Sequence, residues 1–171
     1  MLKYTIRRAT IRDAATIAGH RVAMFRDMGQ VPTTVLADKL LAESATALAE
    51  LLRDGSYAGW LAIDANDGVI AGAGAHVKPQ LPRISSDGFR VTTAPVPLVV
   101  NVYTEPDWRG QGIARALMKA LMVWASARGC DRVVLHASDA GRPLYVSLGF
   151  VATNEMRWSP EHSDHSGIKD Q

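Results

Sequence analysis

The hydrophobic positions in the first half of the chain follow two periods, and each period predicts a different kind of element. Apolar residues recur at helical spacing from Ala14 to Gly29, where Thr10 and Asp13 resemble a capping box at the start of the helix. The same spacing between Leu36 and Asp54 predicts a second amphipathic helix. Short β-branched or aromatic runs predict strands at Tyr4–Arg8, Trp60–Ile63 and Val69–Val77, with a hairpin turn at Asn66-Asp67-Gly68.

The second half of the chain alternates strands with helices after a loop. Residues 78–97 are rich in proline and contain Ser85-Ser86-Asp87-Gly88, which predicts a loop or a lid. The elements predicted after it are a strand at Leu98–Tyr103, a helix at Ile113–Arg128, a strand at Arg132–His136, a short helix at Gly141–Leu148 and one or two strands in Val151–Trp158. This order predicts an α/β (α+β) fold in which a mixed sheet is flanked by helices.

The most informative segment is Leu98–Arg115, LVVNVYTEPDWRGQGIAR. A strand ends in a short polar loop with two glycines, and a helix begins directly after them. The N–H groups in the first turn of a helix have no intrahelical partner, and the helix dipole favours negative charge there. Glycine lets the backbone approach a ligand with no Cβ in the way. The segment therefore predicts a phosphate-binding loop.

Two common phosphate loops fit this segment poorly. A Walker A loop requires Lys and then Ser or Thr directly after its last glycine, but Ile113 and Ala114 follow here. The dinucleotide fingerprint requires a third glycine where this chain has Arg115. Its ribose-binding carboxylate should end the next strand, whereas Asp131 precedes that strand.

A third pattern fits well. Arg109-x-x-Gly112-x-Ala114 resembles the R/Q-x-x-G-x-G/A signature of the GNAT superfamily of acyl-coenzyme A-dependent N-acyltransferases. Downstream, the segment from Ser138 to Phe150, SDAGRPLYVSLGF, resembles the helix and turn N-x-x-A-x-x-L-Y-x-x-x-G-F of that family. The resemblance implies a GNAT-like fold with a mostly antiparallel mixed sheet. It also implies a cofactor cleft where a bulge splays the strand Leu98–Tyr103 from the next strand.

The resemblance implies acetyl-coenzyme A (acetyl-CoA) as cosubstrate and a set of residues that bind it. The pantetheine arm would pair with the main chain of Val102 and Thr104, and Ser138 stands where the family often has an Asn that contacts this arm. The diphosphate would lie on the loop and first helical turn, formed by Arg109, Gly110, Gln111, Gly112, Ile113, Ala114 and Arg115.

Acyl transfer to an amine needs a neutral amine, a stabilised oxyanion and a protonated leaving thiolate. Tyr145 matches the general-acid tyrosine of the family. The base is less defined, because Asn101 stands at or next to a position where many family members carry an acid. Glu105, at the end of the strand, is our predicted base, and His76, His136 or a water chain are the alternatives.

Composition narrows the class of protein further. A formal charge of +2 with scattered basic residues gives no reason to expect nucleic-acid binding. Apolar runs stay short of the ~20 residues of a membrane helix, and the N-terminus does not resemble a signal peptide. The single Cys130 suits a reducing compartment, so we expect a cytoplasmic protein with no membrane partner. The length suits a single domain, 1–171, with a flexible tail at 159–171.

The sequence as a whole predicts an N-acetyltransferase that acts on a primary amine of a small molecule or of a peptide or protein. Two alternatives remain: a non-catalytic acyl-CoA sensor or interaction module, and a nucleotide-binding protein that uses the same loop. We expect no metal, because His162 and His165 stand in the tail without further ligands. The resemblance also implies a homodimer, since family members often dimerise.

Overall fold

The computed structural model describes residues 4–160. The chain divides into two compact units, Met1–His136 and Ala137–Gln171, and each is described by itself. The prediction that the chain is one domain stays a prediction. Most of the predicted tail, with His162 and His165, lies outside the described residues. None of the described helices is long and apolar enough to cross a bilayer.

The first unit is built on a five-stranded sheet in the order β1-β2-β3-β6-β7. Neighbouring strands are antiparallel except for β6 and β7, which are parallel. This confirms the predicted mixed, mostly antiparallel sheet. The strands are β1 (Tyr4–Arg8), β2 (Tyr57–Asp64), β3 (Val69–His76), β6 (Leu98–Thr104) and β7 (Val134–Leu135).

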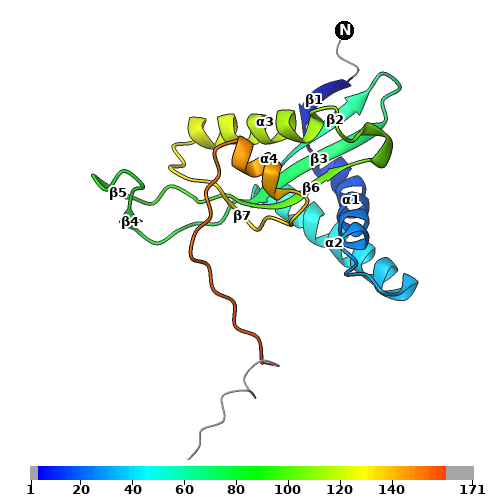
Figure 1. Ribbon diagram of the computed structural model, residues 1–171, viewed down its shortest axis with the longest axis horizontal. Coiled ribbons are helices and arrows are strands. Elements are labelled where there is room, and N and C mark those ends of the chain that lie inside the picture. The colour runs from blue at the N-terminus through cyan, green and yellow to red at the C-terminus, as the bar shows by residue number, and fades with distance from the viewer. Residues whose placement is uncertain (1–3, 161–171) are drawn as a thin grey trace, which may run out of the picture. The chain divides into compact units, whose positions relative to one another are not determined.

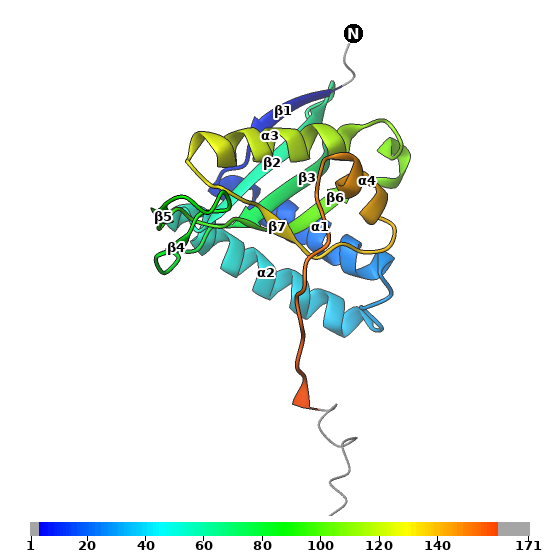
Figure 2. The ribbon, with the colours of Figure 1, turned by 60° about the vertical axis from the view of Figure 1, so that its left-hand side comes forward.

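Three long helices and two short 3-10 turns complete the first unit. They are η1 (Ile11–Asp13), α1 (Ala14–Asp27), α2 (Thr34–Asp54), η2 (Pro106–Trp108) and α3 (Ile113–Ala127). Figures 1 and 2 show α1 and α2 on one side of the sheet and α3 on the other. The sheet is therefore covered on both faces, as its apolar strands require.

The two faces of the sheet have separate cores. On one face, Leu61 of β2 belongs to a buried cluster with residues of α1 and α2, among them Ile17 and Leu48. On the other, the ring of Trp60 lies 5.4 Å from that of Trp124 in α3. Adjacent strand residues point to opposite faces, so Leu61 and Trp60 anchor helices on opposite sides. Each fully buried side chain of this size contributes about 1.5–3 kcal/mol.

Local sequence signals explain how several elements begin and turn. The predicted capping box is present: the Asp13 carboxylate accepts from the Thr10 backbone N–H at 2.7 Å. Both carboxylate oxygens of Asp13 also accept from the Arg7 guanidinium, at 2.7 and 2.9 Å, which ties β1 to the start of α1. The predicted hairpin at Asn66-Asp67-Gly68 joins β2 to β3, with Asp67 at φ 62°. Both predictions are confirmed.

A bulge in β6 lies directly after the last residue of that strand that pairs with β7. Gly74 of β3 pairs with Asn101, whereas Ala75 pairs with Val99, so Val100 is an extra residue in β6. Within residues 4–160, β6 and β7 pair only at Leu98↔Val134 and Val99↔Leu135. From 101 to 104, β6 therefore runs on without β7, as expected for a strand splayed at its bulge.

Two predictions need correction. Val151–Trp158 forms no strand: it is irregular, and Val151, Met156 and Trp158 are exposed. None of the described strands pairs with this segment, and a strand without pairing is not stable. The strand expected at Arg132–His136 is shorter, because only Val134 and Leu135 pair with β6. Within the 78–97 loop, β4 (Arg83–Ile84) and β5 (Val91–Thr92) form a small hairpin.

Candidate functional site

From residue 101 to 104, one edge of β6 has no partner strand among the described residues. Successive N–H and C=O groups of a strand point to alternate edges, so about half of them face the side from which β7 has diverged. Val102 and Thr104, the predicted contacts of a pantetheine arm, lie in this stretch. An extended ligand with its own amide groups could pair there as an added strand. We call this stretch the open edge of β6.

The open edge leads directly into the glycine loop. η2 follows Glu105, and Gly110 and Gly112 adopt left-handed backbone angles, at φ 73° and 78°. These angles explain why glycine stands at both positions. A Cβ at either glycine would meet nothing within 4 Å, so open space lies in front of the loop. Gly112 is also the N-cap of α3, whose first N–H groups have no intrahelical carbonyl.

Arg109 is held at the side of this loop. Its Nε donates to the Thr104 carbonyl at 2.9 Å, and its Nη2 donates to the Asp27 carboxylate of α1 at 2.6 Å. The guanidinium also lies over the Tyr103 ring, 5.6 Å from its centre. The charge predicted to contact a diphosphate is therefore paired with α1 in this structure. Arg115, the other predicted arginine, is half-buried in the first turn of α3.

Glu105 belongs to a small polar group between β6 and α1. The Tyr103 hydroxyl donates to its Oε2 at 3.4 Å, and His20 Nε2 lies 3.6 Å from its Oε1. Burial lowers the pKa of His20, and the nearby Glu105 carboxylate opposes that shift only in part. His20 is therefore neutral at pH 7. Sequence reasoning missed it, although a histidine at a core position of an amphipathic helix is a detectable signal.

A second polar group fixes Asn101 on the α1 side of the sheet. Asn101 Oδ1 accepts from Arg21 Nη1 at 2.7 Å, and its Nδ2 donates to the Tyr57 hydroxyl at 3.3 Å. Burial raises the pKa of Tyr57 to about 12, so its hydroxyl stays protonated. The hydroxyl fits only because Gly74 beneath it has no side chain. Sequence reasoning identified Asn101 but neither Arg21 nor Tyr57, its two partners.

The second unit contains Ser138 and Tyr145. Its helix α4 (Arg142–Ser147) begins after a turn in which the Gly141 N–H donates to Ser138 Oγ at 3.2 Å. It ends at Gly149, φ 90°, where the Phe150 N–H donates back to the Tyr145 carbonyl at 3.0 Å. This is the Schellman geometry, and it accounts for the glycine of L-Y-x-x-x-G-F.

The Tyr145 side chain packs within that turn. Its ring contacts the Phe150 ring edge to face, with the centres 5.9 Å apart. Burial raises the pKa of Tyr145, so the phenol is protonated at neutral pH. A Cβ at Gly141 would approach the Tyr145 ring to 3.0 Å, which explains the glycine where the family has alanine. The predicted role of Tyr145 as an acid stays a prediction.

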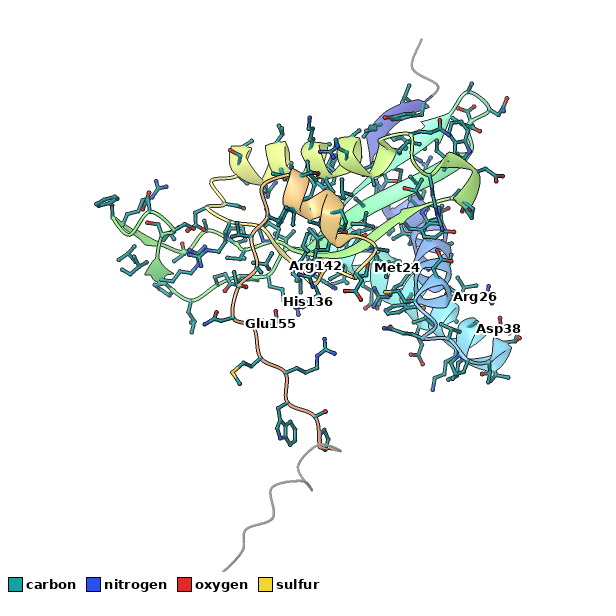
Figure 3. All side chains as sticks on the ribbon, viewed as in Figure 1. Met24, Arg26, Asp38, His136, Arg142 and Glu155 are labelled. Carbon is teal, nitrogen blue, oxygen red and sulfur yellow. The ribbon has the colours of Figure 1, made fainter. Side chains whose placement is uncertain are left out.

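The outer part of α1 is less buried than its pattern predicted. Helical spacing places Met24, Phe25 and Met28 on the apolar face of this helix, but none of them belongs to the buried core, and Met28 is 39% exposed. Figure 3 shows Met24 and Arg26 in this part of α1. Phe25 is covered instead by the Arg21 guanidinium, 4.8 Å from its ring centre. These apolar side chains therefore remain available to a ligand.

Comparison with known protein families agrees with this geometry. The sequence model described as the Acetyltransferase (GNAT) family matches residues 23–150. A predicted acetyltransferase from Clostridium acetobutylicum, whose crystal structure was determined with acetyl-CoA, superposes with a TM-score of 0.78. It is 26% identical, and the match covers 94% of this chain and 99% of that one.

Two curated relatives are similar over different lengths. An aminoglycoside N(6′)-acetyltransferase type 1 from Stenotrophomonas maltophilia is 34% identical over 137 residues, which is 80% of this chain and 74% of the relative. A glucosamine 6-phosphate N-acetyltransferase from Trypanosoma brucei brucei is 35% identical over 54 residues. That match spans 32% of this chain and only 37% of the trypanosomal protein.

Proposed function

This chain belongs to the GNAT family of acetyltransferases, and we propose that it transfers the acetyl group of acetyl-CoA to a primary amine of a small molecule or peptide. The observation that carries the proposal is the continuity between the open edge of β6 and the glycine loop. A free strand edge, two left-handed glycines and a helix N-terminus follow one another within residues 101–115. They suit an amide-containing arm joined to a diphosphate.

The residues present fit coenzyme A. The main chain of Val102 and Thr104 would pair with the pantetheine amides, and Ser138 would add a side-chain contact to the arm. The N–H groups of the loop from Gly110 to Ala114 would bind the diphosphate, where no Cβ blocks the approach at either glycine. Arg109 and Arg115 would supply the countercharge.

The proposed reaction is direct attack of the amine on the thioester. The amine nitrogen forms a bond to the acetyl carbonyl carbon, the carbon–sulfur bond breaks, and Tyr145 protonates the departing thiolate. A phenol of pKa ~10 is a weaker acid than a thiol of pKa ~8.5, so full transfer is uphill by about 2 kcal/mol. Tyr145 therefore acts through a hydrogen bond that strengthens as negative charge develops on the sulfur.

Loss of the amine proton is the other requirement, because a lysine-like amine of pKa ~10.4 is mostly protonated at pH 7. Glu105 stays the predicted base. It lies six positions beyond Val99, the last residue of β6 that pairs with β7. At about 3.3 Å per residue this is roughly 20 Å along the strand. From that end of the open edge Glu105 would act through a chain of waters.

The names of the relatives favour a small-molecule acceptor. One is named for aminoglycosides and the other for glucosamine 6-phosphate, and both acceptors are amino sugars. We therefore place a small amine ahead of a protein amine as the acceptor. The predicted dimer and cytoplasmic location stay predictions.

The first test is thermal unfolding with acetyl-CoA, coenzyme A, NAD and ATP in parallel. A ligand at 100 times its Kd adds about 2.7 kcal/mol to the free energy of unfolding. We expect this shift with the two coenzyme A species only. A larger shift with NAD or ATP would contradict the proposal and support a nucleotide-binding protein.

The second test measures turnover. With an active acceptor, Tyr145→Phe should lower kcat by about 100-fold, the lower range for a general acid, and leave the acetyl-CoA Kd unchanged. Tyr4→Phe on the edge strand β1 is the matched control and should leave kcat unchanged. Binding of acetyl-CoA without turnover across a broad amine panel would instead support a non-catalytic acyl-CoA sensor.

A further inference from the structure

A pocket of about 390 Å³ in the first unit has three Lys or Arg side chains among the residues that line it. Lys78, Arg83 and Arg132 contribute to its wall together with His76 at the end of β3. Its apolar part includes Leu98 and Val134. None of the described residues that line it is acidic. We call it the basic pocket.

The positive charge of the basic pocket is only partly neutralised. Asp131 binds Arg83 through two hydrogen bonds, at 2.7 and 2.8 Å, and lies 3.5 Å from Arg132. Asp131 thus contacts two of the three cationic side chains, and the four residues together carry a formal charge of +2. Burial, with Lys78 and Arg21 nearby, lowers the pKa of His76, so the excess charge resides on the Lys and Arg side chains.

Three buried side-chain polar atoms have no hydrogen-bond partner among the described residues: His20 Nδ1, His76 Nδ1 and Arg83 Nε. Such atoms are rare in folded proteins, and two of the three belong to residues that line the basic pocket. A ligand that brings hydrogen-bond acceptors, above all an anionic one, would compensate for this imbalance.

The basic pocket lies at the closed end of the gap between β6 and β7. Leu98 and Val134 line it, and they are register partners one residue before the last pair, Val99↔Leu135. The glycine loop lies at the opposite end of the open edge. A pantetheine arm that runs from the loop along the open edge would place its thioester toward the closed end. The acceptor amine must reach the same place.

We propose that the basic pocket binds a phosphate or carboxylate group of the acceptor, so that the preferred substrates are amines that also carry an anion. This inference rests on the proposed function, since it assigns the acceptor class of that site. A polycationic amine would be repelled by the two uncompensated charges. A small acceptor is long enough to reach both the basic pocket and the proposed thioester position, because the pocket adjoins the end of the β6–β7 pairing.

The test compares acceptors that differ only in the anion. Glucosamine 6-phosphate against glucosamine tests phosphate, and L-serine against L-serinamide tests carboxylate. We expect kcat/KM to be at least about tenfold higher for the anionic member of one pair, as one charge-assisted hydrogen bond implies. The serine pair is stringent, because the amide has the less basic amine and would otherwise react faster at neutral pH.

Variants then show whether the basic pocket causes the preference. Lys78→Gln and Arg132→Gln should each reduce the ratio of anionic to neutral kcat/KM by about tenfold. Lys119→Gln is the matched control, since Lys119 is exposed on α3 and does not line the basic pocket, so its loss should leave the ratio unchanged. Inorganic phosphate gives a readout without turnover: it should raise the Tm of the wild type more than that of Lys78→Gln.

The outcomes separate the two proposals. Turnover with equal rates for both members of each pair, or a preference that survives both variants, would overturn the acceptor inference and leave acetyl transfer intact. Failure of every amine to react, with no stabilisation by acetyl-CoA, would overturn the proposed function and the acceptor inference with it.

Discussion

Gly112→Ala tests the glycine loop most directly, and Gly55→Ala is its matched control. Gly112 has φ 78° at the start of α3, and Gly55 has φ 81° at the end of α2. A Cβ would meet nothing within 4 Å at either position. Backbone strain should therefore destabilise both variants equally, by about 1–2 kcal/mol for an L-residue in the left-handed region. Each should unfold about 2–8 °C below the wild type, by the usual scaling for this chain length.

The two variants should differ in how much acetyl-CoA raises their free energy of unfolding. At 100 times the wild-type Kd, acetyl-CoA should stabilise the wild type and Gly55→Ala by about 2.7 kcal/mol. A Cβ at Gly112 would project into the space proposed for the diphosphate. If it weakens binding tenfold, the same ligand concentration adds only about 1.4 kcal/mol.

Thermal unfolding with and without acetyl-CoA measures both quantities in one experiment, and calorimetry gives the Kd independently. If acetyl-CoA raises the Tm of the two variants equally, the glycine loop does not bind the diphosphate. If both variants have the wild-type Tm without ligand, the argument from backbone strain is wrong instead.

Three further predictions follow from individual contacts. Asp27→Asn releases Arg109 from a half-exposed ion pair worth up to about 1 kcal/mol. The acetyl-CoA Kd measured by calorimetry should therefore fall by up to about fivefold. An unchanged Kd would show that the ion pair does not compete with acetyl-CoA for Arg109. Gly74→Ala would overlap the Tyr57 hydroxyl, and denaturant unfolding should show a loss of about 1–3 kcal/mol, whereas wild-type stability would contradict the tight packing. The Arg7 guanidinium lowers the pKa of Asp13 from 3.8 to about 2. Above pH 4 the ionised carboxylate therefore stabilises the fold by about 2 kcal/mol, and this stabilisation is lost as the pH falls toward 2. The Tm difference between Asp13→Asn and the wild type should therefore shrink over that pH range, and a constant difference would contradict the linkage.

Sequence alone determined the features that depend on a few consecutive residues. The capping box at Thr10, the turn at Asp67 and the glycine-terminated helix before Phe150 were all readable, because backbone preference and local hydrogen bonds decide them. The backbone of the glycine loop was predictable for the same reason, since Gly110 and Gly112 adopt left-handed angles. The family followed from the spacing of these local motifs.

Sequence failed where an element needed a distant partner. Val151–Trp158 was expected to form one or two strands, but the sequence of a segment does not state which strand will pair with it. The burial expected for the C-terminal end of α1 was wrong for the same reason. Helical spacing identified an apolar face, but only the packing of the folded chain decided that Met28 stays exposed.

Only the tertiary structure decided which polar side chains meet. Arg21 and Asn101 are 80 residues apart in the chain, and Arg109 and Asp27 are 82 apart, yet each pair is hydrogen-bonded. The basic pocket likewise joins the end of β3 to the strand edges of β6 and β7. Such contacts depend on sheet order and on the bulge at Val100, which arise from the packing of the whole sheet. The loop proposed to bind the donor was therefore predictable from the sequence, whereas the charges proposed to select the acceptor came together only in the folded chain.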